Sequence, residues 1–169
     1  MATFISHSPA ETIALGERWG RVAESGLVIG LSGDLGAGKT QFVKGLARGL
    51  GITALVHSPT FALVNIYTGG RLTLFHVDLY RLDTREQIAA AGLEEYLRPA
   101  GVTVVEWAER WFGEVPLGRA RSPLRAGEQT ETALAPERRA GDCAPYLAWV
   151  QIDVLGETER RITYEDTGV

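Results

Sequence analysis

The chain has 169 residues, about one domain, which is enough to bury a core without disulfides or a structural metal. Its 17 basic and 21 acidic residues give a net charge of −4, so no overall positive field favours binding to nucleic acid or an anionic membrane. Glycine is enriched, with 20 residues or about 12%, against a usual figure of about 7%. Lysine is nearly absent, and it occurs only at Lys39 and Lys44.

The cellular compartment is indicated by cysteine usage and by the lack of long apolar segments. The single Cys143 has no cysteine within the chain with which to form a disulfide, which is typical of a reducing compartment. The first residues lack the basic and apolar regions of a signal peptide. The longest apolar runs are about six residues, whereas a membrane helix needs roughly 18. We therefore expect a cytoplasmic protein with no membrane partner.

The first third of the chain has the pattern of helix, strand, loop and helix. A capping-box sequence at 8–11, with proline at the first helical position, is followed by apolar residues at helical spacing and predicts a helix over about 9–24. The apolar run 26–32 predicts a buried strand. A glycine-rich turn follows, and helical periodicity resumes over 41–50.

The middle of the chain predicts a hairpin, a helix and a second buried strand. After a Ser-Pro-Thr turn, strands are expected at 61–67 and 71–78, joined at a Gly-Gly pair. A capping-box spacing and one apolar face favour a helix over 84–97. The mostly β-branched run 101–106 is typical of a strand inside a sheet.

The last third changes composition and then returns to strand patterning. Residues 117–145 contain no Val, Ile, Phe, Tyr or Trp and have little to bury, so we expect a low-complexity, disordered insertion there. Alternating residues over 146–155 and 160–164 predict a second hairpin. We therefore expect one α/β domain over 1–169, of the P-loop NTPase type, with a mostly parallel central sheet, antiparallel hairpins and flanking helices.

A phosphate-binding loop is the most specific motif. Gly33-Asp-Leu-Gly-Ala-Gly-Lys-Thr40 satisfies G-x-x-x-x-G-K-[ST] and stands between an apolar strand and a helix, as the mechanism requires. Its glycines allow successive backbone N–H groups to point at phosphate oxygens, and the helix adds the positive end of its dipole. We expect Lys39 to contact the β- and γ-phosphates and the Thr40 hydroxyl to bind Mg²⁺.

Two carboxylates at strand ends are candidates to bind the metal and orient the attacking water. Asp78 and Glu106 each close a predicted strand, and ligands of open α/β sheets bind beyond the carboxyl ends of strands. Which of the two ligates Mg²⁺ stays open, as does the simpler interpretation that they are surface acids. His76 shares a strand face with Asp78 and could hydrogen-bond it, although a packing role is the commoner one for a lone histidine.

The turn at Ser58-Pro59-Thr60 follows the helix of the phosphate-binding loop. In nucleotide hydrolases a segment at this place becomes ordered by the γ-phosphate and Mg²⁺. A plain Ser-Pro turn leading into a strand accounts for the same residues about equally well.

Taken together, these blocks resemble the TsaE family, bacterial P-loop ATPases of the tRNA threonylcarbamoyladenosine pathway. The matching blocks occur in the family's order over roughly 8–112 and, more loosely, 147–164. They are Gly33–Thr40, Ser58–Asn65, His76–Arg81, Gly92–Leu97 and Val105–Trp107. The chain departs from the family at Ala108, where proline is frequent, and at 117–145, which has no counterpart.

The resemblance implies an ATPase that uses ATP and Mg²⁺ and supports turnover of the TsaD–TsaB complex, which modifies adenosine 37 of tRNA. It implies contact with tRNA only indirectly, through those partners. Carried over by position, Lys39, Asp78 and Glu106 are catalytic, and Thr40, Asp78 and Glu106 bind the metal. The implied ATP contacts are Gly33, Asp34, Leu35, Gly36, Ala37, Gly38, Lys39, Thr40, Gln41 and Trp107. The implied nucleotide-sensitive switch residues are Ser58, Thr60, His76, Tyr80 and Arg81.

The sequence leaves three other functions open. A small-molecule or nucleoside kinase could use the five arginines of 117–145 as a lid, although that segment has little apolar material to order it. A GTPase is disfavoured because the chain has no Asn-Lys-x-Asp motif. A non-enzymatic module gated by nucleotide binding is the third.

Overall fold

A seven-stranded sheet forms the centre of the protein. The computed structural model describes residues 2–113 and 146–164. Within these residues the strands are β1 (Ala2–Ser6), β2 (Leu27–Ser32), β3 (Val64–Tyr67), β4 (Thr73–Asp78), β5 (Gly101–Glu106), β6 (Tyr146–Val154) and β7 (Arg160–Tyr164). Their order across the sheet is β1-β7-β6-β2-β5-β4-β3.

The central strands are parallel and the edges are antiparallel. Strands β6, β2, β5 and β4 pair in parallel, while β3 pairs antiparallel to β4, and β7 pairs antiparallel to both β6 and β1. Every residue of β5 is buried, as expected for a strand covered on both faces. The predicted fold class, a mostly parallel α/β sheet with antiparallel hairpins and flanking helices, is confirmed.

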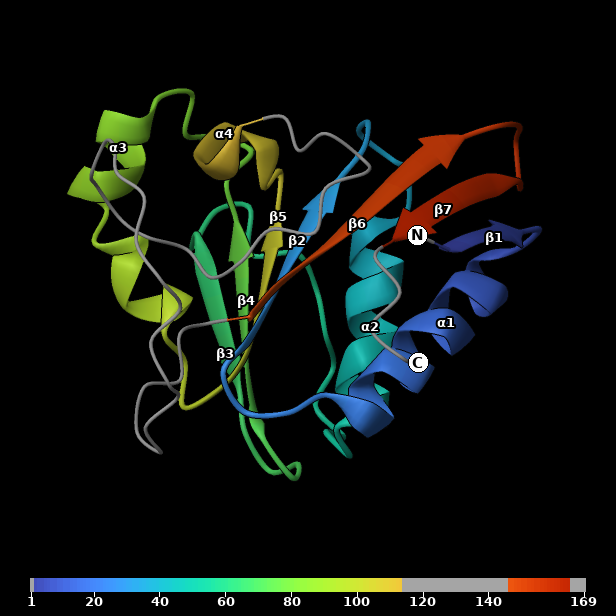
Figure 1. Cartoon of the computed structure of the whole chain (residues 1–169), viewed down its shortest axis with the longest axis horizontal. Coiled ribbons are helices and arrows are strands. Elements are labelled where there is room, and N and C mark those ends of the chain that lie inside the picture. Colours follow the sequence, from blue (N-terminus) through green and yellow to red (C-terminus); the bar gives the residue numbers. More distant parts are fainter. Residues whose placement is uncertain (1, 114–145, 165–169) are drawn as a thin grey trace, which may run out of the picture.

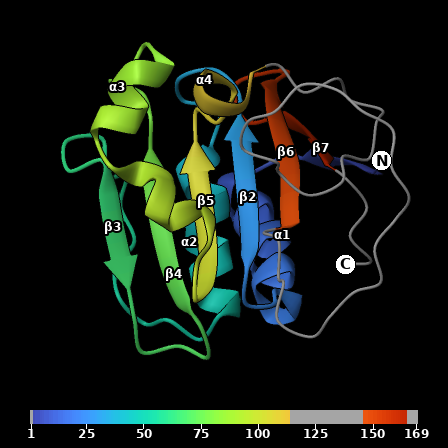
Figure 2. The ribbon, with the colours of Figure 1, turned by 60° about the vertical axis from the view of Figure 1, so that its left-hand side comes forward.

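Helices cover both faces of the sheet (Figures 1 and 2). One face is covered by α1 (Pro9–Val22) and α2 (Lys39–Gly49), and the other by α3 (Arg85–Ala90), the 3-10 helix η1 (Leu93–Leu97) and α4 (Glu109–Phe112). Along β2, Ile29 and Leu31 belong to the core on the α1/α2 face, whereas Val28 belongs to the core on the opposite face. Successive side chains of β2 are thus buried on opposite faces of the sheet, which explains why its sequence is a continuous apolar run.

Close packing of α1 against α2 accounts for part of the glycine excess. A Cβ at Gly16 would lie closer than 3.0 Å to the carbonyl oxygen of Phe42, and one at Gly45 would be equally close to that of Ile13. Gly20 and Gly49 are in the same situation one turn further along. Glycine therefore lets the two backbones touch, which fixes α2, and with it the loop at its N-terminus, against α1.

Several elements differ from the sequence prediction. The first strand, β1, was not predicted because it has five residues and its partner in the described sheet, β7, lies more than 150 residues away in sequence. The strand expected from residue 61 starts at Val64, because Leu63 adopts a left-handed conformation with φ 65°. The helix expected over 84–97 is interrupted at Gly92, also left-handed with φ 68°, and continues as η1.

Two further predictions concern membrane segments and the insertion. None of the helices within the described ranges is long and apolar enough to cross a membrane. The expected insertion at 117–145 lies outside the described residues.

Candidate functional site

The glycine-rich loop joins the end of β2 to the first turn of α2. Gly36 and Gly38 have φ of 77° and 106°, values that L-residues with a Cβ rarely adopt. Gly38 is the N-cap of α2, and no side chain makes a capping hydrogen bond there. The positive end of the helix dipole therefore faces the loop without a capping group, an arrangement suited to an anion.

Lys39 is buried inside this loop. Its Nζ donates to the carbonyl oxygens of Gly33 at 2.6 Å and Asp34 at 2.9 Å, and lies 3.9 Å from the ring centroid of Trp107. Burial lowers the pKa of Lys39, while nearby carboxylates, Glu106 foremost, act in the opposite direction. An anion bound in the loop would return a counter-charge to this desolvated ammonium group.

The Trp107 side chain covers the lysine from the end of β5. Trp107 has φ 60°, a strained conformation for a residue with a bulky side chain, which costs on the order of 1–3 kcal/mol. Its ring packs on Tyr80 at 5.2 Å, and the Arg110 guanidinium lies 5.4 Å from it. Arg110 also donates to the Tyr80 carbonyl and pairs with Asp83 at 2.8 Å, so it joins α4 to the segment after β4.

Glu106 lies beside the loop at the carboxyl end of β5. It is buried, and its Oε1 accepts a hydrogen bond from the Thr40 hydroxyl at 2.9 Å. The same oxygen lies 2.9 Å from Nε2 of His76, which is fully buried on β4. His76 shares a strand face with Asp78, but its hydrogen-bond partner in the described residues is Glu106. Two residues of strand separate His76 from Asp78 by about 6.6 Å, whereas the longer Glu106 side chain on the neighbouring strand comes within reach.

Asp78 stands opposite Glu106 in the parallel register of β4 and β5. Its Oδ2 accepts hydrogen bonds from the hydroxyls of Ser58 and Thr60, both at 2.7 Å, and its Oδ1 accepts one from the backbone N–H of Tyr80 at 2.9 Å. The family resemblance implied two separate switch segments, Ser58–Thr60 and His76–Arg81. The fold brings residues of both segments together around the buried carboxylate of Asp78. Thr40 contacts Glu106 rather than Asp78.

The remaining candidates lie around this centre. Leu35 is 73% exposed at the tip of the loop, and Gln41 is partly buried on the first turn of α2. The Arg81 guanidinium stacks 4.0 Å from the ring centroid of Phe61, which is 85% exposed. The switch candidate Arg81 thus packs on the surface beside the Ser58–Thr60 turn.

Two contributions come from residues outside the predicted site set. Arg160, in the distant β6–β7 hairpin, donates through Nε to the Ala37 carbonyl of the loop at 3.0 Å and through Nη1 to carbonyls of the hairpin turn. Burial raises the pKa of Glu109, whose Oε2 has no hydrogen-bond partner among the described residues. No local motif signals either residue: Arg160 contacts the loop from a hairpin far away in sequence, and Glu109 is buried by the fold.

The side chains present fit a magnesium ion. The Thr40 hydroxyl and the carboxylates of Glu106 and Asp78 are hard oxygen donors gathered at one edge of the sheet, which is the ligand type that Mg²⁺ prefers. Within the described ranges no group of three or more His, Cys, Asp or Glu side chains is arranged to hold a metal by itself. Protein sites for Mg²⁺ generally combine one or two carboxylates with substrate phosphates and water.

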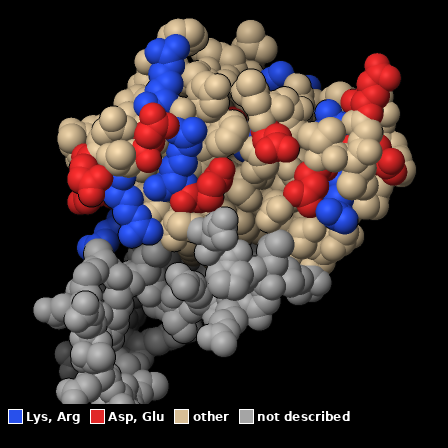
Figure 3. All heavy atoms as spheres, turned by 90° about the horizontal axis from the view of Figure 1, so that it is seen from above, with Lys and Arg blue, Asp and Glu red and all other residues tan. Residues whose placement is uncertain are grey.

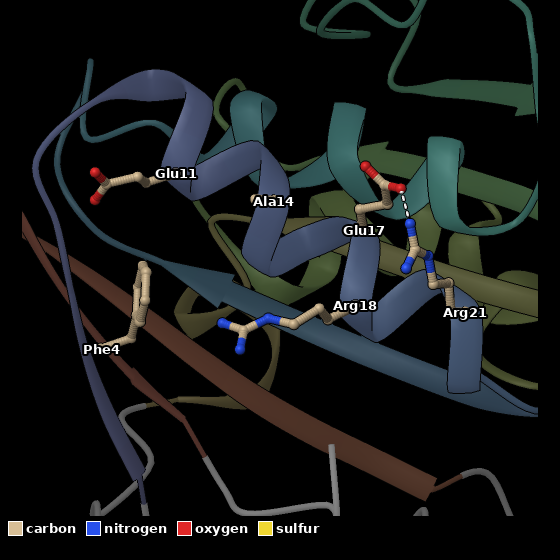
Figure 4. A pocket seen from close by; sticks show the side chains of 6 residues that line it. All are labelled: Phe4, Glu11, Ala14, Glu17, Arg18 and Arg21. Carbon is tan, nitrogen blue, oxygen red and sulfur yellow. Dashed lines mark hydrogen bonds and ion pairs between the residues drawn. The ribbon is translucent and has the colours of Figure 1, made fainter.

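A separate hollow of about 260 Å³ lies between β1 and the outer side of α1 (Figure 4). Its charged groups already have partners in the protein: Glu17 pairs with Arg21, Glu11 accepts the His7 backbone N–H, and the Arg18 guanidinium lies 5.5 Å from the Phe4 ring centroid. None of the loop or carboxylate residues described above lines it. We therefore exclude it from the candidate site.

The fold and site together define the class of the protein: an α/β domain with a glycine-rich Gly-Lys-Thr loop and two buried carboxylates at the carboxyl edge of a parallel sheet. A family model, threonylcarbamoyl adenosine biosynthesis protein TsaE, matches residues 6–135. The chain belongs to the TsaE family.

Relatives from several bacteria support this assignment. The tRNA threonylcarbamoyladenosine biosynthesis protein TsaE of Bacillus subtilis is 43% identical over 122 residues, covering 72% of this chain and 76% of the relative. The TsaE protein of Treponema pallidum is 48% identical, and the match covers 66% of this chain and 82% of the relative. The TsaE protein of Streptomyces coelicolor is 35% identical, and the match covers 85% of this chain and 90% of the relative. The crystal structure of YdiB from Bacillus subtilis is similar, with a TM-score of 0.66 and 32% identity over 96% of this chain and 83% of that one.

Proposed function

We propose that the protein is the Mg²⁺-dependent ATPase of the tRNA threonylcarbamoyladenosine machinery and hydrolyses ATP to ADP and phosphate. The observation that carries this proposal is the 2.9 Å hydrogen bond from the Thr40 hydroxyl to Glu106. It joins the last residue of a Gly-x-x-x-x-Gly-Lys-Thr loop to a carboxylate on the neighbouring parallel strand, the combination that NTP hydrolysis requires.

Binding of the triphosphate would rest on the loop and on Lys39. Gly36 and Gly38 supply the backbone shape, and the N-terminus of α2 supplies the dipole. Lys39 would exchange its bonds to the Gly33 and Asp34 carbonyls for phosphate oxygens. Because the ammonium group is desolvated, we expect its interaction with phosphate to be stronger than that of a surface lysine.

The hydroxyl and carboxylates would divide the remaining tasks. Bound Mg²⁺ would supply charge neutralisation at the phosphates, with Thr40 and Glu106 holding it. Asp78, directly opposite Glu106 in the register of β4 and β5, is then placed to orient the attacking water. Asp78 is held by Ser58 and Thr60, so rearrangement of that turn would change the availability of its carboxylate.

We propose that the protein acts with TsaD and TsaB and that its ATP hydrolysis supports turnover of their complex; membership of the TsaE family, named for threonylcarbamoyl adenosine biosynthesis, supports this proposal. The face at the carboxyl edge of the sheet carries acidic and basic side chains intermingled, with no broad area of positive charge among the atoms shown in colour (Figure 3). With a net charge of −4, this supports contact with protein partners, and with tRNA only through them. We further propose a cytoplasmic location.

Phosphate release by the purified chain, with and without Mg²⁺ and with and without TsaD–TsaB, tests the proposal. We expect Mg²⁺-dependent release that responds to the partners. Lys39→Ala should mainly lose ATP affinity, whereas Glu106→Gln should mainly lose turnover, because charge neutralisation and metal or water positioning are separate contributions. Equal losses of affinity in both variants would refute this division.

The same experiment separates the other functions. Phosphorylation of a small acceptor, with no response to TsaD–TsaB, would identify a kinase, and GTP outcompeting ATP would identify a GTPase. Normal tRNA modification by a Glu106→Gln protein that cannot hydrolyse ATP would identify a module that acts by binding alone.

A further inference from the structure

His76 is a fully buried polar side chain whose only hydrogen-bond partner in the described part of the chain is Glu106. It stands opposite Val104 in the register of β4 and β5, one pleat before the Asp78–Glu106 pair. Glu106 Oε1 thus lies 2.9 Å from both His76 Nε2 and Thr40 Oγ1. Two contacts from different elements hold one oxygen, and the second carboxylate oxygen carries no contact from either.

The environment of the ring indicates which nitrogen carries the proton. Nδ1 of His76 is buried and has no hydrogen-bond partner among the described residues. A proton on Nδ1 would therefore be an unsatisfied buried donor, whereas a proton on Nε2 is donated to a carboxylate. A proton on Nε2 is therefore the arrangement that these hydrogen-bond contacts favour.

We propose that His76 is a positioning residue that sets the orientation of the Glu106 carboxylate at the phosphate-binding loop. This role rests on the proposed ATPase function. Among the described residues His76 hydrogen-bonds neither the loop nor Asp78, so its polar effect on the site passes through Glu106. By holding Oε1 together with Thr40, it fixes the carboxylate rotamer and directs Oε2 away from the two donors, so that Glu106 does not have to reorganise during turnover.

Three substitutions distinguish the hydrogen bond from mere packing. His76→Phe keeps a buried ring but removes the donor. His76→Gln places an amide N–H near the position of Nε2, whereas His76→Asn reaches only the position of Nδ1. We expect Phe and Asn to lower kcat about tenfold or more, as for loss of a hydrogen bond to a charged group, and Gln to recover most of it. Affinity for ATP without Mg²⁺ should stay within about twofold of wild type, because His76 makes no hydrogen bond to the loop in the described part of the chain.

Thr103→Val is the matched control. Thr103 is buried on β5 and donates to the Tyr96 carbonyl, on the sheet face away from Glu106. Its substitution should lower the Tm without changing kcat. If all three His76 variants lose kcat in proportion to their loss of Tm, His76 is only a packing residue and the proposal fails.

A double-mutant cycle with Glu106→Gln isolates the coupling. If His76 acts through Glu106, His76→Asn should cause little further loss of kcat once Glu106 is replaced. The same fractional loss in both backgrounds would overturn the proposal.

The tautomer provides a readout that does not depend on hydrolysis. Long-range ¹⁵N correlation spectra of the wild-type imidazole should show the proton on Nε2. An Nε2 without a proton would overturn the proposal, even if the protein hydrolyses ATP. An Nε2 proton in a protein that hydrolyses no ATP would instead overturn the proposed function and leave the contact with Glu106 established.

Discussion

Substituting Gly45 by alanine tests whether the contact between α1 and α2 depends on glycine. Helix propensity alone favours alanine by about 1 kcal/mol. However, the added Cβ would lie closer than 3.0 Å to three atoms of α1, the carbonyl carbon and oxygen of Ile13 and the amide nitrogen of Glu17. All three are backbone atoms, so no side chain can rotate away and the helices must separate. Overpacking of this kind costs about 1–3 kcal/mol, and rigid partners favour the upper end. We expect a net loss of about 2 kcal/mol.

Thermal unfolding followed by circular dichroism measures this change. For a domain of this size, a loss of about 2 kcal/mol corresponds to a Tm lower by about 4–8 °C. Arg48→Ala is the control, since Arg48 is exposed on the same helix and alanine and arginine have similar propensities. A Gly45→Ala protein that is more stable than wild type, as propensity alone predicts, would refute the reasoning.

Three further predictions concern the site. Burial raises the pKa of Glu109, so the folded state loses stability as the pH rises from 4.5 through the raised pKa. The Glu109→Gln variant should therefore have a higher Tm than wild type at neutral pH. This difference in Tm should close as the pH falls toward 4.5. Arg160→Gln should raise the KM for ATP about tenfold with little change in kcat, because it removes the hydrogen bond that holds the Ala37 carbonyl of the phosphate-binding loop. Arg161→Gln is the control: this residue lies on the exposed side of the hairpin, and its substitution should change neither KM nor kcat. Ser58→Ala should lower the free energy of unfolding by about 1–3 kcal/mol in urea titrations, because it removes a donor from buried Asp78, and an unchanged value would contradict that bond.

The parts of the site that sequence predicts are those governed by local chemistry. The Gly-x-x-x-x-Gly-Lys-Thr spacing sets its own backbone shape, and Gly38 is left-handed where the motif requires it. Asp78 and Glu106 were predicted to lie together because each ends a strand of a parallel sheet, and the register places them opposite one another.

The parts that sequence reasoning missed depend on pairings between distant elements. His76 shares a face with Asp78, yet its partner was decided by the register of β4 on β5 and by the length of the Glu106 side chain. Arg160 reaches the loop across 123 residues of sequence. The pairing of β1 with β7 is likewise decided by the sheet order, and its residues carry no strong strand signal.

The unfavourable features of the described structure are concentrated at one edge of the sheet. Three of the four buried side-chain atoms without a hydrogen-bond partner in the described ranges belong to Ser32, His76 and Glu109, and all three residues lie in or beside the elements that surround the loop. Trp107 is strained and the Lys39 ammonium is desolvated at the same place. Such costs persist where the surrounding fold enforces them and where a ligand can offset them. In the described part of the core around α1 and α2, one such atom is found, on Trp19, so these costs are distributed unevenly and agree with the proposed site at the loop.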